Sequence, residues 1–289
     1  MKINKVSYLV PCYNHRAFVL QSLVSIVEDA RSLECEYEIL IIDDGSTDSS
    51  GGEIGSWVDS SANPNIIYIT RENKGLCATL NELLTLSSGN IIRLCSSDDV
   101  LEVGSTSAMM DVMLQGDFDC VVGDGYIISD LGELVSDSSI LYHGGSVKRL
   151  SNENVASELI KNWCVAGPSS LIRTSVYSQF SYESGAVIDD FDFYLSMMAT
   201  DKRIGYVNLK VCKYRVHGNN TSKTKDLKVR VRNISSFLGA CRKYDVPTFK
   251  HRRELKALIY LSEAKLAYLN NQYIKCSFYF IYYGVMRLC

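Results

Sequence analysis

The sequence predicts an α/β fold in which a mostly parallel sheet carries helices on both faces and a helical appendage follows at the C-terminal end. The first half of the chain alternates short β-rich runs with helical patterns, which is the order expected of parallel strands joined by helices. Clusters of polar residues directly follow these β-rich runs. The last part of the chain has helical periodicity. Together these three observations define the predicted fold class.

Residues 1–115 contain four pairs of a predicted strand and a predicted helix. Each strand is a short apolar run rich in Ile, Val and Leu, and each helix repeats its apolar residues with a period of about 3.6 residues. In chain order the pairs are 6–10 with 18–30, 38–42 with 52–58, 66–69 with 76–86, and 90–94 with 105–114. Because ligands of such sheets bind at the carboxyl ends of the strands, we expect the functional site there.

Residues 116–220 have a mixed pattern and are expected to complete the same domain, which then covers residues 1–220. A loop rich in Gly, Asn, Ser and Thr ends this domain. Two helices are expected in the remaining segment, residues 221–289. Within 116–220 the strand-like runs are 120–122, 170–173 and 205–208, and the helical run is 191–199.

Composition argues against several classes of protein. With 289 residues, of which 46% are hydrophobic, the chain can bury a full core. A net charge of −3 provides no global basic field for a nucleic acid. The ten cysteines are scattered and contain no CxxC pair, which is typical of a reducing compartment. The apolar stretch from Val6 is broken by Pro11, too early for a signal peptide or a membrane span, so we expect a cytoplasmic protein.

Two acidic pairs follow predicted strands. Asp44, after the strand at 38–42, can accept a hydrogen bond from a uracil N–H or a ribose hydroxyl, although an Asx turn with Asp48 capping the next helix also fits. Asp98 and Asp99 follow the strand at 90–94. Adjacent acids in a cleft repel each other, and a divalent cation that also binds a diphosphate would relieve the repulsion. A solvated loop is the alternative interpretation.

A third acidic pair, Asp189 and Asp190, opens the helical run at 191–199. One of these carboxylates can act as a general base that takes the proton of an attacking acceptor hydroxyl. A single base without an enzyme nucleophile gives one displacement, and therefore inversion at the anomeric carbon of a sugar. Acids in the first turn of a helix are also explained by the helix dipole.

Taken together, these clusters make the sequence similar to glycosyltransferase family 2, a large family with the GT-A fold and its Rossmann-like sheet. The resemblance covers residues 5–220 and depends on the order and spacing of its motifs. In chain order the motifs are VSYLVPCYN at 6–14, IIDDGSTD at 41–48, NKGL at 73–76 with Asn81, SSDD at 96–99, the pair Asp189-Asp190, and YRVHG at 214–218.

The resemblance implies a divalent-metal-dependent, inverting transfer of a hexose or an N-acetylhexosamine from a UDP-sugar. Mn²⁺ or Mg²⁺ is the implied metal. The implied roles are nucleotide binding for Pro11, Tyr13 and Asn14, base contact for Asp44, ribose and metal binding for Asp98 and Asp99, and general base catalysis for Asp190.

Two positions depart from the pattern of the family. The metal motif usually reads DxDD, and Ser96 replaces its first acid, which leaves open whether Asp98 or Asp99 is the main metal ligand. Asp189 replaces the commoner Glu, which shortens the reach of this side chain. Neither change removes a group that the mechanism requires.

Two further residues are candidates for donor or metal binding. His217 can be an additional ligand of the metal or the diphosphate, because a neutral imidazole suits Mn²⁺ better than Mg²⁺. A solvated loop histidine is the alternative. Arg71, at a predicted strand end, can bind the nucleotide or lie on the surface as an ordinary arginine.

The acceptor side is expected near residues 163–170, close to the acidic pair in the arrangement of the family. Trp163 can stack on a sugar ring or pack in the core, and Ser169 and Asp189 are further acceptor-side candidates. The implied acceptor is a glycan linked to a lipid diphosphate, as in bacterial O-antigen or capsule synthesis. The segment 221–289 is basic and then aromatic, and is expected either to rest on the anionic inner membrane or to pack on the catalytic domain.

Competing classes are separated by their motifs. The GxGxxG motif of dinucleotide-dependent oxidoreductases does not follow the first strand, and the chain lacks the Gly-Lys dipeptide of a P-loop. A nucleotidyltransferase also joins an acidic pair to a nucleotide pocket and stays open as an alternative. A non-catalytic module that binds a sugar nucleotide or a glycan is the second alternative.

Overall fold

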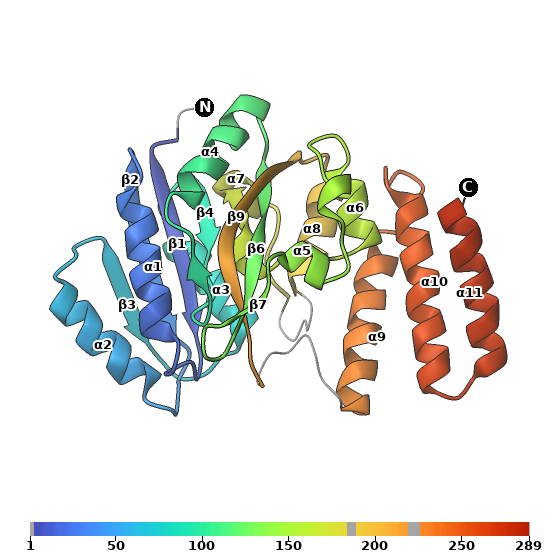
Figure 1. Cartoon of the computed structure of the whole chain (residues 1–289), viewed down its shortest axis with the longest axis horizontal. Helices are drawn as coiled ribbons and strands as arrows, with labels where there is room; N and C mark the ends of the chain where they lie inside the picture. Colours follow the sequence, from blue (N-terminus) through green and yellow to red (C-terminus); the bar gives the residue numbers. More distant parts are fainter. Residues whose placement is uncertain (1–2, 184–188, 219–225, 289) are drawn as a thin grey trace.

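The computed structural model describes residues 3–183, 189–218 and 226–288. Over these residues the chain forms a single nine-stranded sheet with helices around it (Figure 1). The strands are β1 (Lys5–Cys12), β2 (Glu36–Asp43), β3 (Ile66–Thr70), β4 (Ile91–Leu94), β5 (Val100–Leu101), β6 (Cys120–Ser129), β7 (Leu134–Ser136), β8 (Ser170–Arg173) and β9 (Ile204–Val216).

The strand order is β3-β2-β1-β4-β8-β6-β9-β5, and β7 pairs with β6. The first four strands in this order are parallel to one another, and β6 runs parallel to β9 along most of its length. In the register, Cys12 lies opposite Asp43, and Asp43 lies opposite Thr70. The carboxyl ends of β1, β2, β3 and β4 therefore meet at one edge, which we call the C-terminal edge of the sheet.

Helices cover both faces of the sheet, as the sequence predicts. On one face Tyr8 and Val10 share a core cluster with Leu23 of the first helix, and on the other face Leu9 shares a cluster with Leu83 of the third. This alternation follows from the period of two in a strand that is buried on both sides. One face carries α1 (Val19–Arg31), α2 (Ser50–Ser61) and α4 (Ser105–Gly116), and the other carries α3 (Leu76–Leu86), α6 (Val155–Lys161) and α8 (Asp189–Ala199).

Two strands are longer than the sequence predicts. The run at 120–122 continues to Ser129 in β6, and the run at 205–208 continues to Val216 in β9. Gly123 and Gly125 interrupt the apolar pattern of β6, but a Cβ at these positions would lie 2.7 Å and 2.8 Å from side-chain atoms of β9. The glycines therefore permit close packing of the two strands rather than ending one of them. Short helical elements complete this half: α5 (Ser139–Tyr142), η1 (Val147–Arg149), η2 (Gly167–Ser169) and α7 (Thr174–Tyr177).

The expectation of two C-terminal helices is wrong, because the described part of this segment contains three. They are α9 (Leu227–Lys243), α10 (Arg252–Leu269) and α11 (Tyr273–Leu288). The first break contains Pro247, and the second contains Asn271, whose φ of 58° is tolerated better by Asn than by most residues. The break at 270–272 is too short to interrupt a hydrophobic pattern visibly, which is why the sequence reads as one helix.

The C-terminal helices lie side by side at one end of the molecule (Figure 1). Phe237 of α9 stacks on Phe191 of α8 with 4.3 Å between ring centroids. Helix α10 lies between α9 and α11, and Tyr260 of α10 packs against Tyr282 of α11. The aromatic end of the chain thus packs on α10. The domain boundary that we expect near residue 220 stays a prediction. Within the described residues, no helix has both the length and the apolar character needed to cross a bilayer.

Candidate active site

The loops that follow β1 and β2 are joined to each other at the C-terminal edge. Asn14 has a φ of 56°, a left-handed conformation that Asn tolerates. Its backbone N–H donates to Ser46 Oγ at 2.9 Å, and its side-chain oxygen accepts from the N–H of Thr47 at 2.8 Å. The backbone N–H of His15 donates to Ser50 Oγ at 3.0 Å. These bonds hold the two loops together as one wall.

A cavity of about 530 Å³ opens beside this wall. This volume is within the usual range for a site that binds a nucleotide or another small molecule. Tyr13 is 47% exposed, so a face of its ring is accessible to a planar ligand. The lining residues are Pro11, Cys12, Tyr13, Asn14, His15 and Asp44 from the two loops, with Asn73, Gly75, Leu76 and Thr79 from the start of α3.

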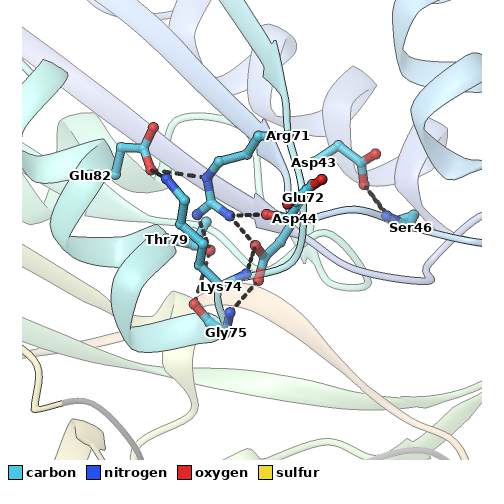
Figure 2. A network of polar contacts seen from close by, with 9 residues as sticks. All are labelled: Asp43, Asp44, Ser46, Arg71, Glu72, Lys74, Gly75, Thr79 and Glu82. Carbon is cyan, nitrogen blue, oxygen red and sulfur yellow. Dashed lines mark hydrogen bonds and ion pairs between the residues drawn. The ribbon is translucent and has the colours of Figure 1, made fainter.

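Asp44 lines the cavity and is hydrogen-bonded to the turn before α3, as Figure 2 shows for the hydrogen bonds. Its carboxylate accepts from the backbone N–H groups of Lys74 at 2.8 Å and Gly75 at 2.9 Å, and it pairs with the guanidinium of Arg71. Only 3% of Asp44 is exposed. A carboxylate offers about four acceptor positions, so one position remains for a ligand in the cavity.

Arg71 lies behind Asp44 and is not among the described residues that line the cavity. Besides Asp44, it donates to Glu82 at 2.9 Å and to Thr79 at 2.9 Å, as well as to the carbonyl of Glu72 (Figure 2). Four of the five guanidinium N–H groups are therefore used. The geometry makes Arg71 a residue that orients Asp44. Its predicted direct contact with the nucleotide stays a prediction.

Asp98 lies between two histidines in the same region. His217 Nε2 is 2.9 Å from Asp98 Oδ2, and His15 Nδ1 is 3.8 Å from Asp98 Oδ1. One ligand atom from each of the three residues lies within 4.8 Å of the others, which is close enough for shared coordination of a cation. His15 was missed by sequence reasoning, although its position directly after Asn14 at the end of the first strand was a usable signal.

The pairing of β5 with β9 brings His217 to Asp98. Val100 pairs with Lys213 in an antiparallel register, so residues that precede Val100 lie beside residues that follow Lys213. Arg215 strengthens this contact: its backbone N–H donates to Asp99 Oδ1 at 2.7 Å, and its Nε donates to the carbonyl of Asp98 at 2.8 Å. Only 2% of Arg215 is exposed. Sequence reasoning missed this positioning residue.

Asp99 does not belong to the His15, Asp98 and His217 group. Its Oδ1 accepts from Arg215, and its Oδ2 has no hydrogen-bond partner within the described residues. Burial, and then the negative charge of Asp98, raise the pKa of Asp99 well above its usual range. The donor set of two imidazoles and one carboxylate fits a divalent ion such as Mn²⁺. Metal binding by Asp99 itself stays a prediction.

Of the predicted acceptor-side residues, Ser169 lies in η2 and Trp163 lies in the loop between α6 and η2. A Cβ on Gly167 would be 3.6 Å from Ser96 Oγ, so η2 lies directly beside the loop that carries Asp98. Ser169 is buried, with its Oγ 3.3 Å from Cys212 Sγ, and its side chain is directed into the sheet. Trp163 packs edge-on against Phe191 and Tyr194 of α8, at ring distances of 5.2 Å and 4.9 Å.

Asp190 lies in the first turn of α8, next to Phe191. It is half-buried, and its Oδ1 accepts from the backbone N–H of Phe191 at 2.7 Å. The side chain of Asp189 lies outside the described part of the structure. Asn81 of α3 exchanges two hydrogen bonds with the backbone of Tyr182, at 2.9 Å and 3.0 Å. These bonds connect the helix beside the cavity to the segment that precedes α8.

At the C-terminal edge of this α/β sheet, a nucleotide-sized cavity lies beside three residues whose ligand atoms are close enough to share a cation. This arrangement is typical of enzymes that transfer a group from a metal-bound nucleotide. Residues 7–180 match the family model for Glycosyl transferase family 2. The chain therefore belongs to glycosyltransferase family 2.

Relatives of known name agree with this family. GlyA, a glycosyltransferase of Streptococcus pneumoniae serotype 4, is 24% identical over 230 residues, covering 76% of this chain and 32% of the relative. GlyG of the same organism is 20% identical over 231 residues, covering 76% of this chain and 73% of the relative. Chondroitin synthase of Escherichia coli is 27% identical over 224 residues, covering 76% of this chain and 30% of the relative. The chain thus spans about a third of GlyA and of chondroitin synthase.

Solved structures share the fold. Residues 1–349 of TarS from S. aureus, in complex with UDP-GlcNAc, superpose with a TM-score of 0.65 at 14% identity, covering 93% of this chain and 73% of TarS 1–349. The mannosyltransferase PcManGT of Pyrobaculum calidifontis, in complex with GDP-Man and Mn²⁺, gives a TM-score of 0.66 at 15% identity, covering 92% of this chain and 73% of the mannosyltransferase. These likenesses confirm the predicted GT-A type of fold.

Proposed function

We propose that this glycosyltransferase moves a hexose or an N-acetylhexosamine, with inversion, from a UDP-sugar to a hydroxyl of a glycan acceptor, and that the reaction requires a divalent metal. One observation carries the proposal. His15 both lines the cavity and belongs to the group with Asp98 and His217. A nucleotide in the cavity would therefore have its diphosphate beside the cation-binding group.

The donor would be held by residues that already line the cavity. The exposed ring of Tyr13 offers a stacking face for the base, and Asp44 keeps one acceptor position for a base N–H or a ribose hydroxyl. Pro11 and Asn14 shape the wall between them. The complexes of TarS with UDP-GlcNAc and UDP support a uracil nucleotide, and the GDP-Man complex of the mannosyltransferase makes guanine the alternative to test.

Mn²⁺ or Mg²⁺ would be held by Asp98 with His15 and His217, and Asp99 would be a further ligand. When bound, the metal would neutralise the negative charge that develops on the leaving nucleoside diphosphate. Asp98 contributes the charge of the site, and the two histidines contribute neutral nitrogen ligands. Arg215 would maintain this arrangement by holding both acidic residues to β9.

Asp190 would act as the general base. Asp190 lies in the first turn of α8, where the N-terminal end of a helix favours negative charge, and the hydrogen bond from the N–H of Phe191 orients its carboxylate. It would accept the proton of the acceptor hydroxyl as that oxygen attacks the anomeric carbon. Asp189, Trp163 and Ser169 would lie on the acceptor side of the reaction. A single base and no enzyme nucleophile would give inversion.

The acceptor would be a glycan on a lipid diphosphate, in the synthesis of a surface polysaccharide such as O-antigen or capsule. One relative supports a lipid-phosphate substrate: undecaprenyl-phosphate 4-deoxy-4-formamido-L-arabinose transferase of Proteus mirabilis is 30% identical over 97 residues, which is 34% of this chain and 30% of that enzyme. Helix α11 would rest on the cytoplasmic face of the inner membrane. Its outer face exposes Ile274 by 89% and Ile281 by 66%.

The experiment is a metal-dependent release assay. The purified enzyme would be incubated with Mn²⁺, a panel of sugar nucleotides and a short lipid-diphosphate sugar, and the nucleoside diphosphate would be measured. Asp190→Asn should lower the rate by at least about 10²-fold. Asp201→Asn is the matched control at the other end of α8. Asp201 has a φ of 54°, which Asn adopts as readily as Asp, so the fold should be kept. The rate of the Asp201→Asn variant should be unchanged.

The same assay separates the alternative functions. Release of diphosphate instead of nucleoside diphosphate would identify a nucleotidyltransferase. Saturable donor binding without turnover, unaffected by Asp190→Asn, would identify a binding module. A rate that Asp190→Asn and Asp201→Asn lower equally would remove Asp190 from the mechanism.

A further inference from the structure

A second cavity, of about 410 Å³, lies where α6 meets α10 and α11. In Figure 1, α6, α10 and α11 lie in the right-hand half of the molecule, away from β1, β2 and β3, which lie in the left-hand half. Four cationic side chains line it: Arg149 from η1, Lys161 from α6, Arg253 from α10 and Arg287 from α11. We call these four residues the basic pocket. It is separate from the cavity that we assign to the donor.

The positive charge of the basic pocket is only partly balanced. Lys161 pairs with Glu158 at 2.9 Å, and Glu254, the acid that lines the pocket, accepts from Ser157 at 3.0 Å on α6. Within the described residues, Arg149 and Arg287 have no carboxylate partner. Like charges that converge from four elements repel each other, and an anion between them would relieve the repulsion.

The first turn of α10 adds to this field. Helix α10 is 18 residues long, and Arg253 and Glu254 lie in its first turn. Its N-cap residue, His251, makes no side-chain capping hydrogen bond. The free N–H groups and the helix dipole at such an end favour a bound anion. Arg253 uses its Nε to donate to the carbonyl of Met286 at 3.1 Å, which leaves the two terminal nitrogens for a ligand.

We propose that the basic pocket binds a phosphate group. The planar guanidinium of arginine donates paired hydrogen bonds that match the oxygen atoms of a phosphate. Three arginines and one lysine carry more positive charge than a single carboxylate ligand would neutralise. A phospholipid headgroup and a free phosphate share this chemistry. The headgroup is favoured because α11 supplies both Arg287 and the exposed Ile274 and Ile281, and its 16 residues contain no acid. This lipid source rests on the membrane contact that is part of the proposed function.

The first test measures pyrophosphate binding by calorimetry with EDTA present, so that metal-dependent binding at the donor cavity does not contribute. The probe variant is Arg149→Gln with Arg287→Gln, and the matched control is Lys228→Gln with Lys265→Gln, which removes two charges from α9 and α10 outside the pocket. Pyrophosphate affinity should fall at least about tenfold in the probe variant and less than about twofold in the control. Equal affinities in the two variants, or no binding by the wild type, would overturn the proposal.

The second test separates the two sources of phosphate. Binding to phosphatidylcholine vesicles with and without phosphatidylglycerol would be measured for the same variants. A loss of at least about tenfold on the anionic vesicles, in the probe variant but not in the control, would support the headgroup. Unchanged vesicle binding together with lost pyrophosphate binding would support free phosphate. A variant with Arg149→Lys and Arg287→Lys, which keeps the charge, should recover part of the binding if the fold is intact.

Failure of this inference and failure of the proposed function give different results. Nucleoside diphosphate release on a water-soluble acceptor should be within about twofold of the wild type in the pocket variants, because the pocket is distant from the donor cavity. Absence of release in the wild type would count against the proposed function alone. Ile274→Asp with Ile281→Asp should weaken vesicle binding without changing pyrophosphate binding, which tests the membrane contact by itself.

Discussion

Glu38, near the start of the parallel strands, and Asp99, at their C-terminal edge, differ in how far the chain compensates their negative charge. Near the start of β2, Glu38 pairs with Lys5 at 2.6 Å and accepts from Ser7 Oγ at 2.6 Å and from the N–H and hydroxyl of Ser88 at 2.6 Å and 2.8 Å. Burial acts to raise the pKa of Glu38, but these hydrogen bonds outweigh it and lower the pKa to about 2. The charge of this acid is fully compensated by the chain.

At the C-terminal edge, Asp98 and Asp99 are adjacent and buried, and an oxygen of Asp99 has no hydrogen-bond partner in the described part of the chain. The pKa of Asp99 is raised where that of Glu38 is lowered. A buried acid that has all its hydrogen-bond and charge partners stabilises the fold. Adjacent buried acids that lack such partners lower the stability of the fold, and they are typical of sites where a ligand supplies the positive charge. This difference supports the proposal that the chemistry takes place at the C-terminal edge.

The largest effect is expected from Asp98→Asn. Nucleoside diphosphate release should fall by at least about 10²-fold, because the charged ligand of the cation group is lost. The temperature of unfolding should stay the same or rise, because the repulsion between Asp98 and Asp99 is removed. Initial rates and calorimetric unfolding would be measured on the same preparation. An Asp98→Asn variant that is active but less stable would show that Asp98 stabilises the fold and is not needed for the reaction, which would contradict the contrast with Glu38.

His15→Ala tests whether the residue shared by the cavity and the cation group binds metal. The affinity for Mn²⁺, measured by titration calorimetry, should fall by about 10-fold to 100-fold. His251→Ala, in the loop before α10, is the control and should leave the affinity unchanged. Equal affinities for the two variants would show that the metal, if it binds, does so without His15.

Glu38→Gln tests the opposite end of the strands. The free energy of unfolding at neutral pH should fall by about 2 kcal/mol, because charge-assisted hydrogen bonds are lost, and the Michaelis constant for the donor should not change. Urea unfolding and initial rates would measure the two quantities. A loss of activity per folded molecule would mean that the two ends are not independent.

The stabilisation by Glu38 should also depend on pH. Its pKa in the folded protein is below the ordinary value of 4.5, so its contribution is complete above that pH and is lost as the pH falls from 4.5 towards about 2. The unfolded chain binds the proton first over this interval. Urea unfolding of the wild type should therefore weaken more steeply across it than that of Glu38→Gln. Parallel curves would contradict the assigned hydrogen bonds.

The smallest effect is expected from Arg71→Gln. Asp44 loses a charged partner but keeps two backbone donors, so the Michaelis constant for the donor should rise by about fivefold to tenfold. The turnover number should change by less than about twofold, which is the signature of a positioning residue. Arg31→Gln, at the exposed end of α1, is the control. A large fall in turnover would place Arg71 in direct contact with the reacting groups.

Much of the fold was predictable because its signals are local. The four strand-and-helix pairs of residues 1–115 appear with boundaries shifted by a few residues, since each depends on a periodicity that a short window contains. The extensions of β6 and β9 were not predictable from windows of this kind. In the sequence alone, Gly123 and Gly125 indicate the end of a strand. Only the packing of β9 side chains against them shows why glycine is needed inside β6. The third C-terminal helix was missed because its start depends on one left-handed residue, Asn271.

The sequence by itself determined the family, the first four strand-and-helix pairs, and the edge at which the polar residues gather, because parallel strands all end at the same side. Tertiary structure alone decided which of these residues meet. The antiparallel pairing of β5 with β9 brings His217 to Asp98 across more than a hundred residues, and the loop after β1 brings His15 to the same place. Contacts of this kind depend on the register between distant strands, which no local pattern encodes.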